Sequence, residues 1–306
     1  MPFTIKEKHL QRLCLLNGFQ IPPAELIFFG LRGCLPTTED TMTFRMQQQV
    51  ELTQVDYLHP RCTLGQWRPA EGTFALFPGS TIPNQQNVKN AVLNGGRGSN
   101  QLMTGYYKDY RKGVHKVGKP TGHEAFRQTE GRPIHRTADD LDFDNDDRVE
   151  FENPFDNLHS GWSMGISHTY SSAGCQVVVG FPKCPQRGNQ PDAGPWRVFK
   201  ENAYSLPQNS FRYFLLNGVD AERVASNENA QLSARLRFGA ESPLVTEVQT
   251  KLREAGFYEG VTDGFFGERT LRAVMAFQTA KFGRDADDGI VGPTTASALQ
   301  MNWPNF

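Results

Sequence analysis

The chain has 306 residues, which is long enough for two domains that each bury a hydrophobic core. Its 32 basic and 33 acidic residues nearly cancel and are dispersed, so charge gives no reason to expect a nucleic acid or an anionic membrane surface as a partner. No apolar run approaches the roughly 20 residues of a membrane span, and the charged N-terminal residues lead into no apolar secretory core. We therefore expect no membrane span, and either a protein that stays inside the cell or one that is exported by another route.

Five cysteines are scattered along the chain without the paired spacing of a zinc site, and their odd number argues against a complete disulfide framework. We therefore expect neither a metal nor a cofactor. Cys14, Cys34 and Cys62 stand among apolar residues and are predicted to be small buried hydrophobes. Cys184 stands close to two prolines and is predicted to be either a loop thiol or a disulfide partner of Cys175.

The N-terminal part of the chain contains patterns of helix and strand. Residues 4–17 place apolar side chains near one helical face and precede Gly18, which predicts a short amphipathic helix. Residues 25–31 form the compact apolar run of a buried strand. Residues 48–77 alternate polar and apolar side chains, which predicts successive antiparallel strands, and residues 83–93 begin with proline and predict a short helix.

The middle of the chain is more irregular. His115 and His123 stand beside basic residues and are predicted to be surface histidines. Residues 139–147 are rich in aspartate but lack the glycine and the closing glutamate of a calcium loop, so a solvated acidic loop is favoured over a calcium site. Residues 196–204 predict a helix and residues 211–216 a last strand, and the polar, weakly periodic residues 221–241 predict a linker.

A repeated pattern follows this predicted linker. Its two copies consist of Asp263, Gly264, Gly267 and Thr270, and of Asp288, Gly289, Gly292 and Thr295. In each copy the Asp-Gly pair predicts a tight turn, the second glycine a positive φ, and the threonine a cap for the following helix. With an earlier apolar pattern over residues 244–252, the repeat predicts a unit of three helices.

This unit resembles the peptidoglycan-binding domain family, whose pattern runs "LQxxLxxxGF" and then "DGxxGxxTxxAVxxFQ…DGxVGxxTxxAL". The matching segments are residues 248–252, 255–257, 263–274, 277–278 and 288–299. The resemblance implies affinity for cell-wall glycopeptide and a location in the bacterial cell envelope, with the repeated aspartates, glycines and Thr270 as candidate binding residues and with ligand contacts beside the two loops. Residues 281–287 make the second connection slightly longer than in the family, and a purely structural helical cap is the alternative.

Residues 157–180 contain a candidate nucleophile and a candidate base. His159 precedes Cys175 by 16 residues, and Cys175 follows Ala173 and Gly174, which allow a tight turn that exposes the sulfur. A thiol attacks as the thiolate, so it needs a nearby imidazole, and such a turn can direct backbone N–H groups toward a developing oxyanion. The apolar residues 177–180 predict a buried strand after the turn.

The motif of this stretch resembles that of the L,D-transpeptidase (YkuD-type) catalytic domain. The residues that carry the resemblance are His159-Ser160-Gly161 and Ser172-Ala173-Gly174-Cys175, with residues 118–122 resembling the PTG turn of the family. The resemblance covers about residues 48–218.

The resemblance implies a role for each residue of the motif. Cys175 would attack a tetrapeptide stem, release D-alanine and form a thioester, and His159 would hold or accept the thiol proton. The carbonyl of Ser160 would orient the imidazole, and the N–H groups of Gly174 and Cys175 would stabilise the oxyanion. Ser172 belongs to the same turn. An amine would then complete a cross-link, whereas water would give L,D-carboxypeptidase activity.

The chain departs from the family in two places. Ala173 stands where the family often has a second histidine, and Val177 stands where it often has arginine or asparagine. The oxyanion pocket or the contact to the substrate carboxylate must therefore be built differently, from Gln176, Arg136 or another arginine. His168 is a rival for the role of base.

Together these patterns predict an α+β protein. Its parts are an N-terminal helix and strand (1–45) packed on the catalytic domain, a β-rich catalytic domain (46–220), a linker (221–241) and a peptidoglycan-binding domain (242–306). The leading hypothesis is an L,D-transpeptidase or L,D-carboxypeptidase, with peptidoglycan stem peptides and glycan as partners. The alternatives are a wall-targeting effector or lysis enzyme delivered without a secretory signal, and a non-catalytic peptidoglycan-binding scaffold.

Overall fold

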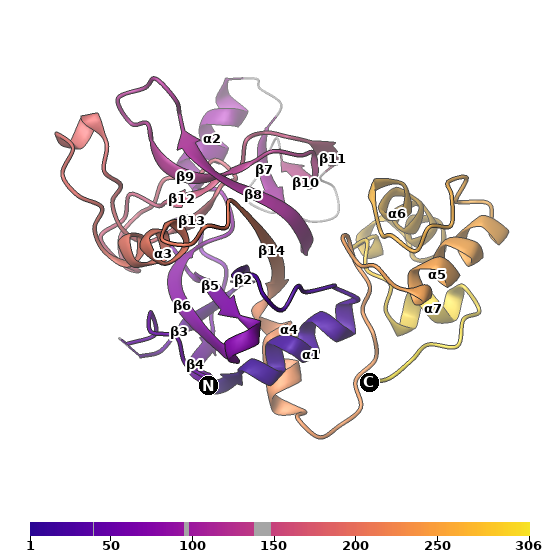
Figure 1. Ribbon diagram of the computed structural model, residues 1–306. Coiled ribbons are helices and arrows are strands. Elements are labelled where there is room, and N and C mark those ends of the chain that lie inside the picture. The colour runs from indigo at the N-terminus through magenta and orange to yellow at the C-terminus, as the bar shows by residue number, and fades with distance from the viewer. Residues whose placement is uncertain (39, 95–97, 138–147) are drawn as a thin grey trace.

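The computed structural model describes residues 1–38, 40–94, 98–137 and 148–306, and its centre is a closed β-barrel flanked by helices (Figure 1). The predicted mixed α+β class with a β-rich main part is confirmed. The barrel strands lie in the order β12-β13-β6-β5-β2-β14-β8-β9. Their bounds are β2 Ile27–Arg32, β5 Cys62–Arg68, β6 Thr73–Ser80, β8 Gly105–His115, β9 His123–Gln128, β12 Leu158–Ser160, β13 Gln176–Val178 and β14 Ser210–Asn217.

Two three-stranded sheets accompany the barrel, in the orders β1-β4-β3 and β11-β10-β7. Their strands are β1 Pro2–Lys6, β3 Cys34–Pro36, β4 Gln47–Leu52, β7 Ser99–Leu102, β10 Arg132–Thr137 and β11 Arg148–Glu152. The antiparallel strands expected over residues 48–77 are confirmed, because β4 pairs with β3 and β5 pairs with β6 in antiparallel register. Strand β1 also pairs with β4, so the N-terminal segment is the outer strand of the first of these two sheets.

The apolar run of β2 is buried on both faces of the sheet. Phe28 points into a cluster inside the barrel, where its ring stacks on Phe211 with centroids 4.5 Å apart. Ile27, Phe29 and Leu31 belong to a second cluster that includes residues of the helices on the outside. A strand covered on both faces needs apolar side chains at successive positions, which explains why this segment shows no alternation.

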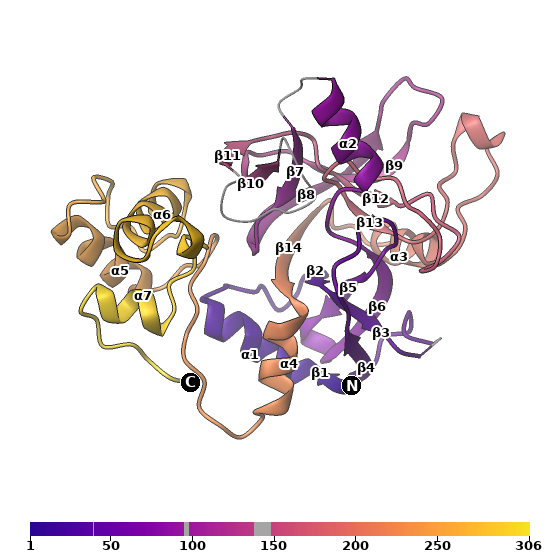
Figure 2. The same cartoon turned by 180° about the vertical axis from the view of Figure 1, so that it is seen from behind.

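Four helices pack around the barrel (Figures 1 and 2). They are α1 Glu7–Asn17, α2 Gln85–Leu93, α3 Pro195–Tyr204 and α4 Gly218–Ser226. The first three and strand β14 lie where the sequence predicts them. Helix α1 ends at Gly18, whose φ of 69° is left-handed and favours glycine. Among the described residues, no helix is both long and apolar enough to span a bilayer.

The segment predicted as a linker, residues 221–241, is packed against the rest of the protein. It begins within α4, where Ala221 and Val224 are buried against the barrel, and it continues as an extended chain. The N–H of Tyr106 donates to the carbonyl of Phe238 at 2.9 Å, and Arg237 is 1% exposed. The segment between the two parts is therefore packed, and its apolar side chains are buried although its composition is largely polar. The division of the chain at residues 221–241 stays a prediction.

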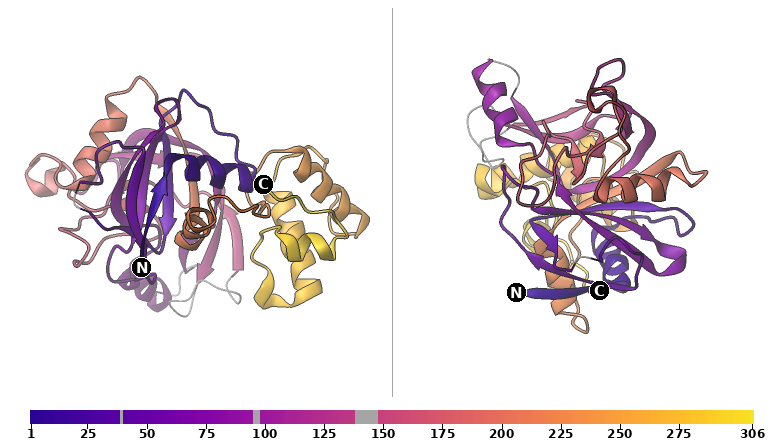
Figure 3. Two further views of the ribbon diagram at one scale, coloured as in Figure 1. Left: turned by 90° about the horizontal axis from the view of Figure 1, so that it is seen from below. Right: turned by 90° about the vertical axis from the view of Figure 1, so that its left-hand side faces the viewer.

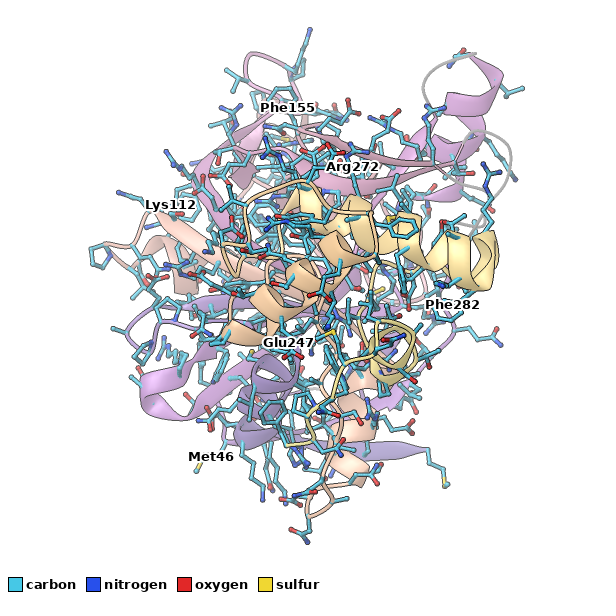
Figure 4. All side chains as sticks on the ribbon, turned by 90° about the vertical axis from the view of Figure 1, so that its right-hand side faces the viewer. Met46, Lys112, Phe155, Glu247, Arg272 and Phe282 are labelled. Atoms are coloured by element: carbon cyan, nitrogen blue, oxygen red, sulfur yellow. The ribbon has the colours of Figure 1, made fainter. Side chains whose placement is uncertain are left out.

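The C-terminal unit contains the three predicted helices, α5 Pro243–Glu254, α6 Glu268–Phe282 and α7 Pro293–Ala298. They lie beside the barrel, as seen from below in Figure 3, and in front of it in Figure 4, where Glu247, Arg272 and Phe282 mark α5 and α6. One continuous cluster of buried apolar side chains includes residues of the barrel and of these helices. The two parts therefore share a core.

Candidate functional site

Cys175 lies in a turn directly before β13, and Ser172 shapes this turn. The hydroxyl of Ser172 donates to the carbonyl of Cys175 at 2.8 Å and accepts from the N–H of Gly174 at 3.2 Å. Gly174 has a φ of 134°, and a Cβ atom at this position would collide with the amide of Asn100. Only glycine fits at this position, so Gly174 is needed for the turn.

His159 lies on β12, which pairs in parallel with β13, the strand that follows Cys175. Its Nδ1 is 2.7 Å from the carbonyl oxygen of Ser160, which is the contact that the family resemblance implied. A carbonyl only accepts hydrogen bonds, so the neutral ring carries its proton on Nδ1 and has a free lone pair on Nε2. The hydroxyl of Ser160 donates to the carbonyl of Gly180 at 2.6 Å and so anchors this strand.

Two further histidines lie at the same place, contrary to the prediction that they are surface residues. His115 ends β8 and His123 begins β9, and the two are directly paired in the antiparallel register of this hairpin. The His115 ring stacks on His159 with centroids 4.1 Å apart, and the His123 ring meets His159 edge-on at 5.2 Å. The turn at residues 118–122 was the one sequence signal for this hairpin, and the two histidines flank it.

The hydrogen bonds of His115 assign its tautomer. The N–H of Gln128 donates to Oδ1 of Asn157, so the Nδ2 group of Asn157 is the one that faces Nδ1 of His115, at 2.8 Å. An amide NH2 group only donates, so Nδ1 of His115 accepts and its proton is on Nε2. His115 and His159 therefore carry their protons on different nitrogens.

These side chains surround a cavity of about 330 Å³. Its lining consists of Asn87, His115, Lys116, Thr121, His123, His159, Trp162, Ser171, Ser172, Ala173, Cys175 and Gln186. One imidazole nitrogen of His115, one of His159 and the Cys175 sulfur lie within 4.8 Å of one another. The structure thus brings the predicted base and nucleophile to one cavity, and it adds His115, His123 and Lys116 to them.

Asp156 is a second neighbour of the thiol that the sequence analysis did not single out. Its Oδ1 is 3.9 Å from the Cys175 sulfur, and its other oxygen contacts Nδ2 of Asn100. The side chain is 4% exposed, and Arg132 and Arg136 lie near enough to act on its charge. Asp156 follows a segment without a strand pattern, so no local sequence signal indicated that it lies next to Cys175.

Burial dominates the electrostatics of this site. It raises the pKa of Asp156 to about 7 against the attraction of the two arginines, and it raises the pKa of the Cys175 thiol, with the Asp156 charge adding to the effect. Burial also lowers the pKa of His115 to about 3 and holds the pKa of His159 well below its ordinary value. The free protein therefore holds a neutral thiol beside a neutral imidazole at neutral pH.

The thiol and two imidazoles are the kinds of ligand that Zn²⁺ prefers, but the tautomers do not favour a metal. Nδ1 of His115 is engaged by Asn157, and Nε2 carries the proton. Binding a metal through Nε2 would require this proton to move to Nδ1, toward an amide that only donates. The absence of a metal and of a cofactor stays a prediction, and the acidic residues 139–147 lie outside the described residues.

Several residues considered for the site lie elsewhere. Gln176 accepts a hydrogen bond from the hydroxyl of Tyr213 inside the barrel, and Arg136 forms an ion pair with Glu150 on β11. Neither residue lines the cavity. His168 is exposed and does not line it either. The N–H of Gly174, one of the two expected oxyanion donors, is bonded to Ser172, whereas within the described part of the chain the N–H of Cys175 makes no hydrogen bond to another residue.

The other four cysteines do not line the cavity. Cys14, Cys34 and Cys62 are buried, as predicted. Cys184 is also buried and free, so the disulfide considered between it and Cys175 is not formed.

The two C-terminal loops are each held by one buried glutamine. Nε2 of Gln249 donates to Asp263 Oδ1, the Phe265 carbonyl and Thr270 Oγ1 at 2.9–3.0 Å, and its Oε1 accepts from the N–H of Gly264. In the second loop Gln278 makes the same four hydrogen bonds, to Asp288, Ile290, Thr295 and Gly289. The repeated aspartates and threonines therefore close the loops.

Two details of these loops differ from the prediction. Positive φ occurs at the first glycines, Gly264 (75°) and Gly289 (69°), whereas Gly267 and Gly292 have negative φ and are themselves the N-caps of α6 and α7. Thr270 lies inside the first turn of α6, so it does not cap the helix. A groove of about 500 Å³ beside the second loop includes Asp288 and Gly292, and a binding role for these residues stays a prediction.

Comparison with known proteins supports the assignment of the C-terminal unit. Residues 241–299 match the family described as "Putative peptidoglycan binding domain". The N-acetylmuramoyl-L-alanine amidase CwlM of Mycobacterium tuberculosis is 38% identical over 98 residues, which cover 29% of this chain and 23% of that protein. The spore cortex-lytic enzyme of Bacillus subtilis is 32% identical over 89 residues, which cover 29% of this chain and 28% of that protein.

The chain thus spans less than a third of the length of these two curated relatives. No solved structure gives a significant match to the chain.

Proposed function

We propose that this protein acts on peptidoglycan as a cysteine L,D-transpeptidase or L,D-carboxypeptidase, and that residues 241–299 hold it on the wall. The observation that carries the proposal is the arrangement around Cys175. Its turn is shaped by Ser172 and Gly174, and a histidine whose Nδ1 is bound to the Ser160 carbonyl presents Nε2 to the same cavity. The match of the C-terminal residues to a peptidoglycan-binding family supports the substrate class.

The neutral thiol and imidazole fit a mechanism in which the proton moves as the bond forms. The Cys175 sulfur attacks the carbonyl carbon of the residue before the terminal D-alanine, and the thiol proton passes to Nε2 of His159. The N–H of Cys175 can donate to the oxyanion. The amide C–N bond then breaks, the D-alanine nitrogen takes the proton from His159, and a thioester remains on Cys175.

The second half of the reaction releases this thioester. An amine from another stem attacks the thioester carbonyl, gives a proton to His159, and leaves a new amide bond while the proton returns to the sulfur. Water in place of the amine gives hydrolysis. Both outcomes use the same protein groups, so the proposal includes both reactions.

The test is the release of D-alanine from a tetrapeptide stem by the full chain. Cys175→Ala should abolish the release and leave binding to isolated cell walls unchanged, whereas the matched variant Cys184→Ala removes another buried, free thiol and should keep the activity. His159→Gln should lower the rate by about 10²–10⁴, the usual contribution of a general base. Undiminished release by Cys175→Ala would refute the proposal.

A non-catalytic wall-binding scaffold is the second candidate, and the raised pKa of the Cys175 thiol favours it. A carbapenem-type β-lactam separates the two functions, because a working nucleophile of this kind is expected to be acylated. An adduct on Cys175 in the intact mass supports the enzyme. A protein that stays unmodified while it binds cell walls supports the scaffold.

A further inference from the structure

Among the described residues, Lys116 is the one basic side chain, lysine or arginine, that lines the cavity together with Cys175. It is the first residue of the loop between β8 and β9, directly after His115, and its side chain is exposed. Its φ of 53° is left-handed, and its carbonyl accepts from the N–H of Lys119 at 3.1 Å, so the tight turn of the hairpin determines the direction of its side chain. The hairpin that positions two histidines therefore also positions a positive charge.

This charge has no ion-pair partner among the described residues. The nearby carboxylates are used by another lysine, since Lys200 forms ion pairs with Glu124 and Asp192. Asp156 contacts the sulfur but does not line the cavity. The charge of Lys116 acts on two groups of the cavity: it adds to the effect of burial that lowers the pKa of His159, and it opposes the larger effect of burial that raises the pKa of the Cys175 thiol.

The cavity is consequently suited to a ligand with a negative charge near its mouth. An ammonium group binds a carboxylate as a point charge, without the fixed geometry that arginine imposes. A volume of about 330 Å³ is at the small end of ligand sites, which suits the end of a peptide better than its middle. Gln176 and Arg136, the groups considered for such a contact, do not reach the cavity.

We propose that Lys116 binds a carboxylate of the ligand that reacts with Cys175, which in the reaction proposed above is the α-carboxylate of the terminal D-residue. This assignment of the substrate end rests on the proposed function. The carboxylate contact itself is a property of the cavity and can be tested without that function. Lys116 is then the residue that selects a free C-terminus over an internal peptide bond.

The first test compares two alkylating agents that differ in charge, iodoacetate and iodoacetamide. Both transfer their carbon to the Cys175 sulfur with loss of iodide, and the thiol proton goes to the solvent. The ratio of the two rates at Cys175, followed by peptide mass, cancels changes in the reactivity of the thiol itself. Lys116→Met should lower the iodoacetate to iodoacetamide ratio by about two- to fivefold, the effect of one partly exposed ion pair.

Two matched variants control this result. Lys119 lies on the same loop and is exposed but does not line the cavity, so Lys119→Met should leave the ratio unchanged. Lys116→Arg should keep the ratio, and high salt should reduce the difference between wild type and Lys116→Met. An equal ratio in wild type and Lys116→Met, or an equal loss in Lys119→Met, would overturn the proposal.

The second test uses a tetrapeptide stem with a free C-terminal carboxylate and the same stem with a C-terminal amide. Lys116→Met should raise KM about two- to fivefold for the acid alone, with little change in kcat. If neither stem is turned over by the wild type, the proposed function fails and the alkylation ratio still decides the role of Lys116. If D-alanine release depends on Cys175 but the ratio does not depend on Lys116, this proposal alone fails.

Discussion

Replacing Asp156 by asparagine tests how burial controls the charge next to the Cys175 thiol. Asparagine has nearly the same shape as aspartic acid and cannot ionise. Asp156 is 4% exposed, and burial raises its pKa from 3.8 to about 7 despite the attraction of Arg136 and Arg132. Cys175, the amide of Asn100 and the hydroxyl of Tyr110, which donates to the Asp156 carbonyl, also face this residue.

The sign of the effect of pH on stability follows from the pKa of Asp156 in the unfolded chain and its pKa in the folded protein. Between about pH 4 and pH 7 the unfolded chain has this carboxyl ionised while the folded protein keeps it protonated, so raising the pH favours unfolding. The stabilising effect is fully present below the unfolded pKa and is lost as the pH rises through the folded pKa. At about 1.36 kcal/mol per unit, the shift corresponds to about 4 kcal/mol.

The assay is urea unfolding followed by tryptophan fluorescence between about pH 4 and pH 8. The free energy of unfolding of the wild type, relative to that of Asp156→Asn, should fall by about 4 kcal/mol across this range and then level off. Asp109→Asn is the matched control: hydrogen bonds from Arg111 and Ser210 outweigh burial and lower the pKa of Asp109, so this carboxyl is ionised in the folded and the unfolded state above about pH 4, and the variant should show the same pH dependence as the wild type. Parallel pH dependences of wild type and Asp156→Asn would refute the reasoning.

Two further predictions concern the base and the C-terminal loops. Burial holds the pKa of His159 well below 6.5, so the acid limb of kcat/KM for D-alanine release should also lie well below pH 6.5, and a limb centred near 6.5 would contradict a buried neutral base. Gln278→Ala removes four hydrogen bonds of the second loop and should lower the free energy of unfolding by about 2–3 kcal/mol, whereas Gln11→Ala, on an exposed face of α1, should change it by less than about 0.5 kcal/mol. Equal melting temperatures of these two variants would show that Gln278 does not hold the loop.

Local sequence patterns were sufficient to predict those elements whose conformation depends on residues close to them in the chain. The apolar run of β2, the stop of α1 at Gly18 and the three C-terminal helices all lie as the sequence predicts. The turn at Gly174 was also predictable from the sequence, because only glycine permits the backbone at this position. In these cases the physical cause lies within a few residues, so pattern and structure agree.

Long-range pairing explains what the sequence analysis missed. His115 and His123 looked like surface histidines because each stands beside basic residues, yet the register of β8 and β9 pairs them and closure of the barrel carries both to His159. The polar composition of residues 221–241 likewise did not show that Phe238 and Arg237 are buried against other segments of the chain. Such contacts depend on segments far apart in the chain.

By itself, the sequence determined that the chain has a β-rich part and a three-helix C-terminal unit, and it identified the pair of Cys175 and His159. Only the tertiary structure decided which groups surround that pair: the ring of His115 stacked on His159, the ring of His123 edge-on to it, a buried carboxyl near the sulfur, and Lys116 at the cavity. The reason is physical. The chemical type of a side chain can be read from the sequence. Its charge state depends on burial and on neighbouring groups that only folding brings together.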